Sequence, residues 1–456
     1  MRADDMRIGF KLVLVAVMTM LILIPLAMVN GLIGERQRYR DAAVADIGRM
    51  YASPQTVFGP VLTVPYTESV DLQETGGDGV VRTVRKRQAS AWTFFPTRLD
   101  ASGTVATATR RRGLYRVPVY EWAGTVKADF DVQIPGDVAG ADRVIGTPVL
   151  GYGVTDVRGL HGAPKLQIDG REVALLEGAG TQDDAGMHAA LPVPAPGAHF
   201  ALISQLQLKL AGTQSIAFVP LGKQNHIALG SKWPHPSFQG LSPWQSEISD
   251  TGFAAQWQVA SIATDAQRQY LARLPQNTTT GSGPSAARDV TLPTLGVVLD
   301  DPIDAYTLAD RATKYGVLFV AITFVGFFMF EVIRQLPIHP IQYGLVGLAL
   351  VIFFLLLVSL SEHVPFPVAY AAASGGCIGL IGFYLSAVLR SALRGAAFGA
   401  TLGLLYAALY GLLISEDNAL VLGSLLLFAI LAAVMIATRR LDWYRLGSQV
   451  ASTRTA

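Results

Sequence analysis

Two pairs of ionisable residues lie at the ends of long apolar stretches, where charge is costly. Glu331 precedes Arg334 by three residues, so the two share one helix face, and Glu362 is followed directly by His363. Ionisable residues in or beside a membrane are expensive and often functional. The alternative is that both pairs anchor helix ends at headgroup depth. All four residues are candidate functional residues.

The histidines offer one further candidate site. The seven histidines never occur at i, i+3 or i, i+4 spacing, and a zinc site needs three or four converging ligands. His226 and His235, within HIALGSKWPHPSFQG, are the best candidate pair. In the competing interpretation, which we favour, Trp233 and Phe238 fill the core while the neighbouring prolines fix a turn. Trp233 and His235 are retained as candidates, and no metal or cofactor is expected.

Signatures of known catalytic mechanisms are missing from the sequence. It contains no HExxH, Walker A or GxSxG motif, and its single cysteine, Cys377, excludes a disulfide. Cys377 lies in an apolar stretch beside Gly375, Gly376, Gly379 and Gly382, a pattern that predicts close helix packing through small residues. The expectation is a protein that is not an enzyme.

Two basic runs could contact anionic lipid headgroups. They are Val84–Arg87 and Arg110–Arg112. The simpler interpretation is that both are solvated strand ends or hairpin turns. A formal net charge of only +2 gives no reason to expect a nucleic-acid partner.

The composition indicates a membrane protein, and the apolar residues are grouped. Hydrophobic residues make up 51% of the chain and charged residues only 15%, against about 25% in soluble domains. A spanning helix needs about 20 mostly apolar residues. Six segments qualify: Leu12–Leu32, Val317–Ile333, Ile341–Leu360, Val368–Leu389, Gly395–Ile414 and Leu420–Thr438. The first is interpreted as an uncleaved anchor because no small-x-small cleavage site follows it.

The short loops predict the orientation of the spans. Basic residues mark the cytoplasmic side, and the loops SEHVPFP and SEDN contain neither Lys nor Arg. Both termini are therefore expected in the cytoplasm and the large middle domain in the periplasm. The basic positions on which this rests are Arg334, Arg390, Arg394, Arg439, Arg440 and Arg445.

The middle of the chain predicts strands. Segments such as VLTVPY, TVKADFDV and AAQWQVASI alternate with period two between Gly, Pro, Asp or Ser. The expected fold is an α+β membrane protein with a β-rich, antiparallel periplasmic domain. Its expected parts are 1–34 (cytoplasmic N-terminus and first helix), 35–314 (β domain), 315–440 (bundle of five transmembrane helices) and 441–456 (cytoplasmic tail).

Several long pieces, in order along the chain, resemble the CreD family of inner-membrane proteins. They include SPQTVFGPVLTVPY, RRRGLYRVPVYEW, FVPLGKQNHIALGSKWPHPSFQG, DPIDAYTLADRATKYGVLFV and LLVSLSEHVPFPVAYAAAS. The resemblance covers nearly the whole chain. It implies a protein of the bacterial inner membrane linked to envelope integrity and stress response, and it brings no established catalytic residues.

Three functions follow as hypotheses. The first is a non-enzymatic envelope protein whose periplasmic domain recognises membrane lipid, a peptidoglycan-related ligand or a periplasmic envelope protein. The second is a lipid or small-molecule transporter or flippase-like activity of the C-terminal bundle, which would use Glu331 or Glu362. The third is a membrane-proximal enzyme using His235 or His363. The sequence leaves the oligomeric state open.

Overall fold

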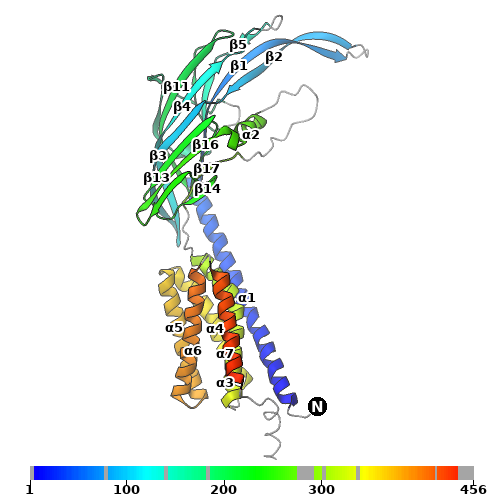
Figure 1. The fold of residues 1–456 in the computed structure, drawn as a ribbon, viewed down its shortest axis with the longest axis vertical. Coiled ribbons are helices and arrows are strands. Elements are labelled where there is room, and N and C mark those ends of the chain that lie inside the picture. Colours follow the sequence, from blue (N-terminus) through cyan, green and yellow to red (C-terminus); the bar gives the residue numbers. More distant parts are fainter. Residues whose placement is uncertain are drawn as a thin grey trace, which may run out of the picture. The chain divides into compact units, whose positions relative to one another are not determined.

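Helices precede and follow a strand-rich middle in the chain (Figure 1). The computed structural model describes residues 5–75, 81–137, 142–180, 185–274, 292–299, 305–334, 339–415 and 418–439; the expected tail 441–456 lies outside them. The chain forms two compact units. The helical unit comprises Met1–Asp41 and Ile303–Ala456, and the β unit comprises Ala42–Pro302.

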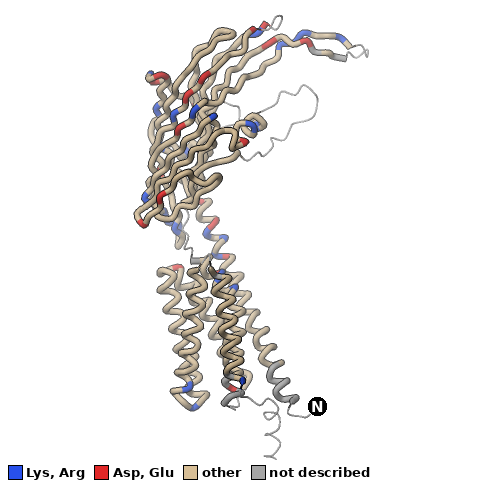
Figure 2. Tube along the Cα trace, viewed as in Figure 1, with Lys and Arg blue, Asp and Glu red and all other residues tan. Residues whose placement is uncertain are grey.

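The helices are long and apolar, as the six predicted segments require. They are α1 (Asp5–Met50), α3 (Ala305–Arg334), α4 (Pro340–Ser361), α5 (Phe366–Val388), α6 (Ala392–Ile414) and α7 (Ala419–Thr438). Five of them are long and apolar enough to cross a membrane, and α7 has the shorter apolar stretch Leu420–Ile436. An apolar N-terminal helix, a β-rich middle and apolar C-terminal helices confirm the predicted fold class. In α3 to α7, charged residues lie near helix ends (Figure 2).

Prolines set the ends of the central helices. Pro340 is the first residue of α4, and the side chains of His339 and Gln342 complete a reciprocal cap. Pro365 precedes α5, and α4 ends at Ser361. The residue before a proline is pushed towards extended geometry, so the chain cannot run helically from α4 into α5.

Two sheets form the β unit. One has the path β14-β17-β12-β1-β6-β10-β9, with β2 and β5 also on β1, and the other has the order β15-β16-β13-β3-β4-β11-β7-β8. The first sheet contains β1 (Gln55–Thr75), β2 (Val81–Phe94), β5 (Val144–Ile145), β6 (Val149–Val154), β9 (Leu176–Glu177), β10 (Gly186–Ala190), β12 (Ser215–Phe218), β14 (Ser237–Gly240) and β17 (Leu295–Val298). The second contains β3 (Arg98–Arg112), β4 (Tyr115–Gln133), β7 (Leu160–Ile168), β8 (Arg171–Val173), β11 (His199–Thr213), β13 (Gln224–Ser231), β15 (Gln245–Ser249) and β16 (Gly252–Ala260). The helix α2 is Ala266–Arg273, and 3-10 turns lie at Val157–Gly159 and Ser261–Ala263.

Among the described strands, the pairing is antiparallel except at two places. β1 runs parallel to β12, and β13 runs parallel to β3, pairing strands that lie far apart in the sequence. Local hairpins alone would give only antiparallel pairs, which is why the period-two pattern did not reveal these. The last strand, β17, lies between β14 and β12.

One core lies between the two sheets. Side chains of both contribute to it, including Leu62 of β1 and the fully buried Trp122 and Trp257 of β4 and β16. Glycines make room for the first indole: a Cβ at Gly124 would lie 2.2 Å from Cζ2 of Trp122. The C-terminal end of α1 also belongs to the β unit, where Ile47 packs with Val117 and Val119 of β4.

Candidate functional site

Glu362 joins three helices of the helical unit. It caps the C-terminal end of α4, and its side chain is 8% exposed. Its Oε1 accepts a hydrogen bond from the Tyr306 hydroxyl of α3 at 3.1 Å and lies 3.5 Å from Nε of Arg36 on α1. A nearly buried carboxylate needs such partners because desolvation otherwise penalises its charge.

His363 does not share this arrangement. Its ring is exposed, and Nδ1 lies 3.1 Å from the carbonyl oxygen of Ser359 in α4. Adjacent residues on a helical turn point in different directions, so the imidazole and the Glu362 carboxylate have separate partners. The structure therefore pairs Glu362 with Tyr306 and Arg36, and not with the adjacent His363.

Glu331 is a second buried carboxylate. The residue is 4% exposed, and Oε2 accepts a hydrogen bond from the Tyr343 hydroxyl at 2.7 Å. Rings of Phe324 and Phe327 pack against Tyr343. Arg334 is the last residue of α3, but its side chain lies outside the described set, so its pairing with Glu331 stays a prediction.

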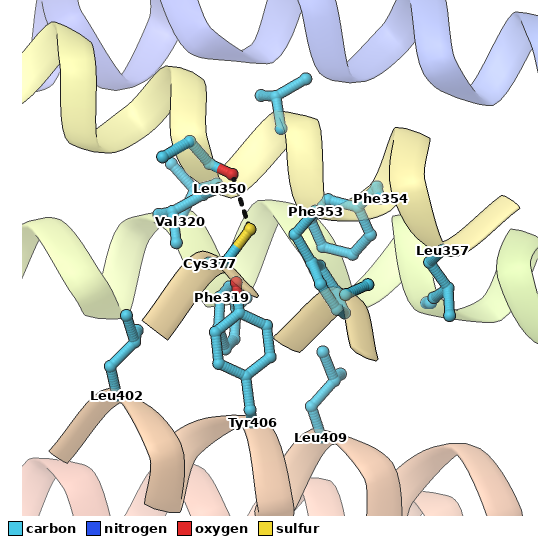
Figure 3. Close-up of a cluster of buried hydrophobic side chains, with 14 of the residues drawn as sticks. Phe319, Val320, Leu350, Phe353, Phe354, Leu357, Cys377, Leu402, Tyr406 and Leu409 are labelled. Carbon is cyan, nitrogen blue, oxygen red and sulfur yellow. Dashed lines mark hydrogen bonds between the residues drawn. The ribbon is translucent and has the colours of Figure 1, made fainter. Parts of the chain in front are cut away.

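Aromatic rings fill the interior of the helical unit around Cys377 (Figure 3). The Cys377 thiol donates to the carbonyl of Ala349 at 3.4 Å, and the Tyr370 hydroxyl donates to the carbonyl of Tyr406 at 2.7 Å. The ring of Tyr406 lies 4.6 Å from those of Phe319 and Phe353, centroid to centroid. Backbone carbonyls thus satisfy these buried donors, as an apolar surrounding demands.

The glycines beside Cys377 do not act as predicted. A Cβ at Gly375, Gly376 or Gly379 would meet nothing within 4 Å among the described atoms, so the expected close packing at these three positions is wrong. The tight approach lies elsewhere: a Cβ at Gly395 would come within 2.7 Å of Ser386. The error arises because small residues mark a close contact only on a face that meets another helix.

A buried polar network in the β unit was not foreseen. Oδ2 of Asp156 accepts hydrogen bonds from the backbone N–H and hydroxyl of Ser53, both at 3.0 Å, and Oδ1 accepts from Nε of Arg158 at 2.9 Å. The hydrogen bonds from Arg158, followed by those from Ser53, hold the pKa of Asp156 well below its usual range, although burial opposes the shift.

Gln55 continues this network. Its side-chain amide donates to the carbonyls of Asp156 and Ala211 at 2.9 and 3.0 Å, and its Oε1 accepts from the Asp156 N–H at 3.1 Å. The bonded residues are about 100 to 156 positions apart in the chain, and no local motif predicts hydrogen bonds of such long range.

A cavity of about 250 Å³ lies beside this network in the β unit. Its wall carries two guanidinium groups and several apolar side chains. The lining residues are Val44, Ala45, Gly48, Arg49, Ser53, Pro54, Arg158, Thr213 and Gln214. Arg158 is already bonded to Asp156 and to the carbonyl oxygen of Arg49, which leaves its charge largely compensated.

The two candidate histidines, His226 and His235, have different partners in the β unit. Nδ1 of His226 lies 3.7 Å from Oδ1 of Asp100 on the neighbouring parallel strand, whereas the His235 carbonyl accepts from Nε1 of Trp233 at 2.9 Å. Trp233 and Phe238 pack against the core. Among the described residues, no group of three His, Cys, Asp or Glu could hold a metal ion.

Two comparisons with known proteins match almost the full sequence. The family described as "Inner membrane protein CreD" matches residues 7–444. Inner membrane protein CreD of Escherichia coli (strain K12) is 35% identical over 429 residues, which are 93% of this chain and 91% of that protein. A solved M1 zinc metallopeptidase of Deinococcus radiodurans covers 36% of this chain and 38% of its own at 12% identity, with a TM-score of only 0.18, and carries no argument. The chain therefore belongs to the CreD family of inner membrane proteins.

Proposed function

We propose that this protein maintains the integrity of the cell envelope without catalysis, and that its β unit recognises an envelope component or a partner protein in the periplasm. One observation carries the proposal: the β unit is inserted between α1 and α3, so both of its chain connections lead into apolar helices. A domain tethered in this way meets molecules at a membrane surface.

The distribution of basic residues supports a periplasmic β unit. Arg390 and Arg394 lie in the connection from α5 to α6 and at the start of α6, and Arg439 caps the C-terminal end of α7. The segment SEHVPFP between α4 and α5 contains no Lys or Arg. Basic connections stay in the cytoplasm, so both termini belong there.

A phosphatase fusion tests this orientation directly. Alkaline phosphatase joined after Leu446 should be inactive, because that enzyme matures only in the periplasm, whereas the same enzyme inserted at exposed Val193 of the β unit should be active. Activity from the first fusion would overturn the orientation.

The alternative is lipid or small-molecule transport by the C-terminal bundle. Its support is Glu331, a carboxylate buried between α3 and α4. Transporters usually keep polar groups and broken helices near mid-membrane, whereas aromatic rings fill the described interior here. This packing favours recognition over transport.

Photo-crosslinking in native membranes tests recognition. A benzophenone amino acid replaces Trp244, which is 78% exposed on the β unit, and a matched probe replaces Phe428, which is 69% exposed on α7. The proposal expects the first probe to capture one defined envelope lipid, peptidoglycan precursor or periplasmic protein, whose removal reproduces the envelope defect of a deletion strain. Capture of transported lipid by the bundle probe alone, with a silent β unit, would favour transport.

A further inference from the structure

The tip of the β3–β4 hairpin concentrates positive charge in the β unit. Four arginines, Arg110, Arg111, Arg112 and Arg116, surround the turn at Gly113 and Leu114, and all four are exposed. Leu114 at the turn is 52% exposed. An apolar residue framed by cations is a combination that suits a membrane surface, where the cations meet headgroups and the apolar side chain enters below them.

The strand register places two of these charges face to face. Arg111 lies directly opposite Arg116 across the hairpin. Like charges at opposed positions destabilise a sheet. Among the described residues, neither arginine has an acidic partner, so an anion bound between them would relieve their repulsion.

In the other basic run, the charge of Arg85 is compensated within the protein. Arg85 of β2 lies opposite Asp71 of β1 and forms an ion pair with Asp142 at 2.9 Å. The simple interpretation, a solvated hairpin with charges of both signs, fits that run. It does not fit the pair Arg111 and Arg116.

Contacts within the β unit tie the tip to the C-terminal part of α1. Arg112 forms an ion pair with Asp46 at 2.6 Å, and the guanidinium of Arg110 lies 5.8 Å from the ring centroid of Tyr51.

We propose that the β3–β4 tip binds the phosphate groups of anionic membrane lipid, with Arg111 and Arg116 as the headgroup clamp and Leu114 as the apolar contact. This deepens the proposed function by naming one envelope component, and it rests on that proposal only for the place of the β unit at a membrane. Tethering by α1 favours lipid over a soluble polyanion, because the bilayer is the one anionic surface to which the chain itself is attached.

Fluorescence quenching in proteoliposomes tests the proposal with the full chain. Cys377, which is buried, is replaced by Ala, and a single cysteine at Leu114 carries an environment-sensitive dye. The quencher is a headgroup spin-labelled lipid, in vesicles of phosphatidylcholine alone or with increasing phosphatidylglycerol. A second label at exposed Ala106, about 20 Å along β3 from the end of the strand at Arg112, serves as a ruler.

The expected result is quenching at Leu114 that requires phosphatidylglycerol, weakens with added salt and is absent at Ala106. In the variant Arg111→Gln, Arg116→Gln, the phosphatidylglycerol fraction at half-maximal quenching should rise about fivefold or more. Arg111→Lys, Arg116→Lys should restore most of the response. The matched control Lys165→Gln, Arg171→Gln removes two exposed cations from β7 and β8 and should change nothing.

Equal quenching in neutral and anionic vesicles, no quenching in either, or an unchanged response in the Gln variant would each overturn the lipid site. The vesicles carry the same lipids in both leaflets, so the result does not depend on the side that the β unit occupies. Failure of this experiment is therefore distinguishable from failure of the phosphatase fusions.

Discussion

The two units hold their buried carboxylates in different ways. In the helical unit, Glu331 and Glu362 each accept a hydrogen bond from a tyrosine of another helix. In the β unit, Asp156 accepts several hydrogen bonds from backbone and side chains around one turn. A helix forms its backbone hydrogen bonds internally, so a single side-chain hydrogen bond is enough to link two helices. Where strands end, backbone N–H groups need acceptors, and one carboxylate serves several.

The sharpest test of the β unit is its core. Trp122→Ala removes a fully buried indole and should lower the free energy of unfolding by about 3 to 5 kcal/mol. Thermal unfolding of the full chain in detergent, followed by near-ultraviolet circular dichroism, measures the loss. Trp244→Ala removes an indole that is 78% exposed and should stay within about 0.5 kcal/mol of wild type. Equal effects would show that the core described between the sheets is misassigned.

The Asp156 network should matter next. Asp156→Ala leaves the Ser53 N–H and the Arg158 guanidinium without their acceptor and should cost about 2 kcal/mol. Chemical denaturation at pH 7 measures the change, with Asp250→Ala, an exposed aspartate of the same unit, for comparison. A loss no greater than that of Asp250→Ala would contradict the network's role.

The same network predicts a dependence on pH. Because the folded pKa of Asp156 is depressed below the unfolded value of about 3.9, its stabilisation is fully present above that value and declines as the pH falls through the folded pKa. The stability difference between wild type and Asp156→Asn should therefore be constant from pH 5 to 8 and shrink below about pH 4. A difference that grows on acidification would have the wrong sign.

Packing in the helical unit can be tested with two glycines. Gly395→Ala places a methyl group within 2.7 Å of Ser386 and should lower the melting temperature, at a cost of about 1 to 2 kcal/mol. Gly376→Ala meets open space and should be neutral or slightly stabilising, because alanine favours helix. Destabilisation by Gly376→Ala instead would indicate that this face meets a partner in the membrane.

The smallest expected effect concerns Glu362 and His363. Glu362→Gln keeps the Tyr306 contact but removes the attraction to Arg36, a loss of about 1 kcal/mol that should weaken the envelope phenotype at normal abundance. His363→Ala should have no effect, because the exposed ring forms only a hydrogen bond with the Ser359 carbonyl of α4 among the described residues. If the double variant fully complements a deletion strain, Glu362 is an interfacial anchor alone.

Sequence patterns predicted the helices and strands better than the tertiary contacts between them. Apolar length located the helices, and period-two alternation located the strands, because both follow from local geometry. Asp156 and Glu362 each have one partner that lies more than 100 residues away in the chain, Ser53 and Arg36 respectively. Such contacts depend on strand order and helix packing, and neither pairing had a local signal. Glu362 itself was identified because charge beside an apolar span is costly wherever its partner lies.

The position of β17 has a consequence for biogenesis. Leu295–Val298 completes the sheet between β14 and β12, yet it is the last strand to leave the ribosome and closely precedes α3 in the chain. Until it arrives, β12 lacks the neighbour that covers its edge, and such an edge invites pairing with other chains. The β unit must therefore complete its fold late in synthesis, when the next membrane helix is about to emerge, and factors that guard nascent chains would be needed up to that moment.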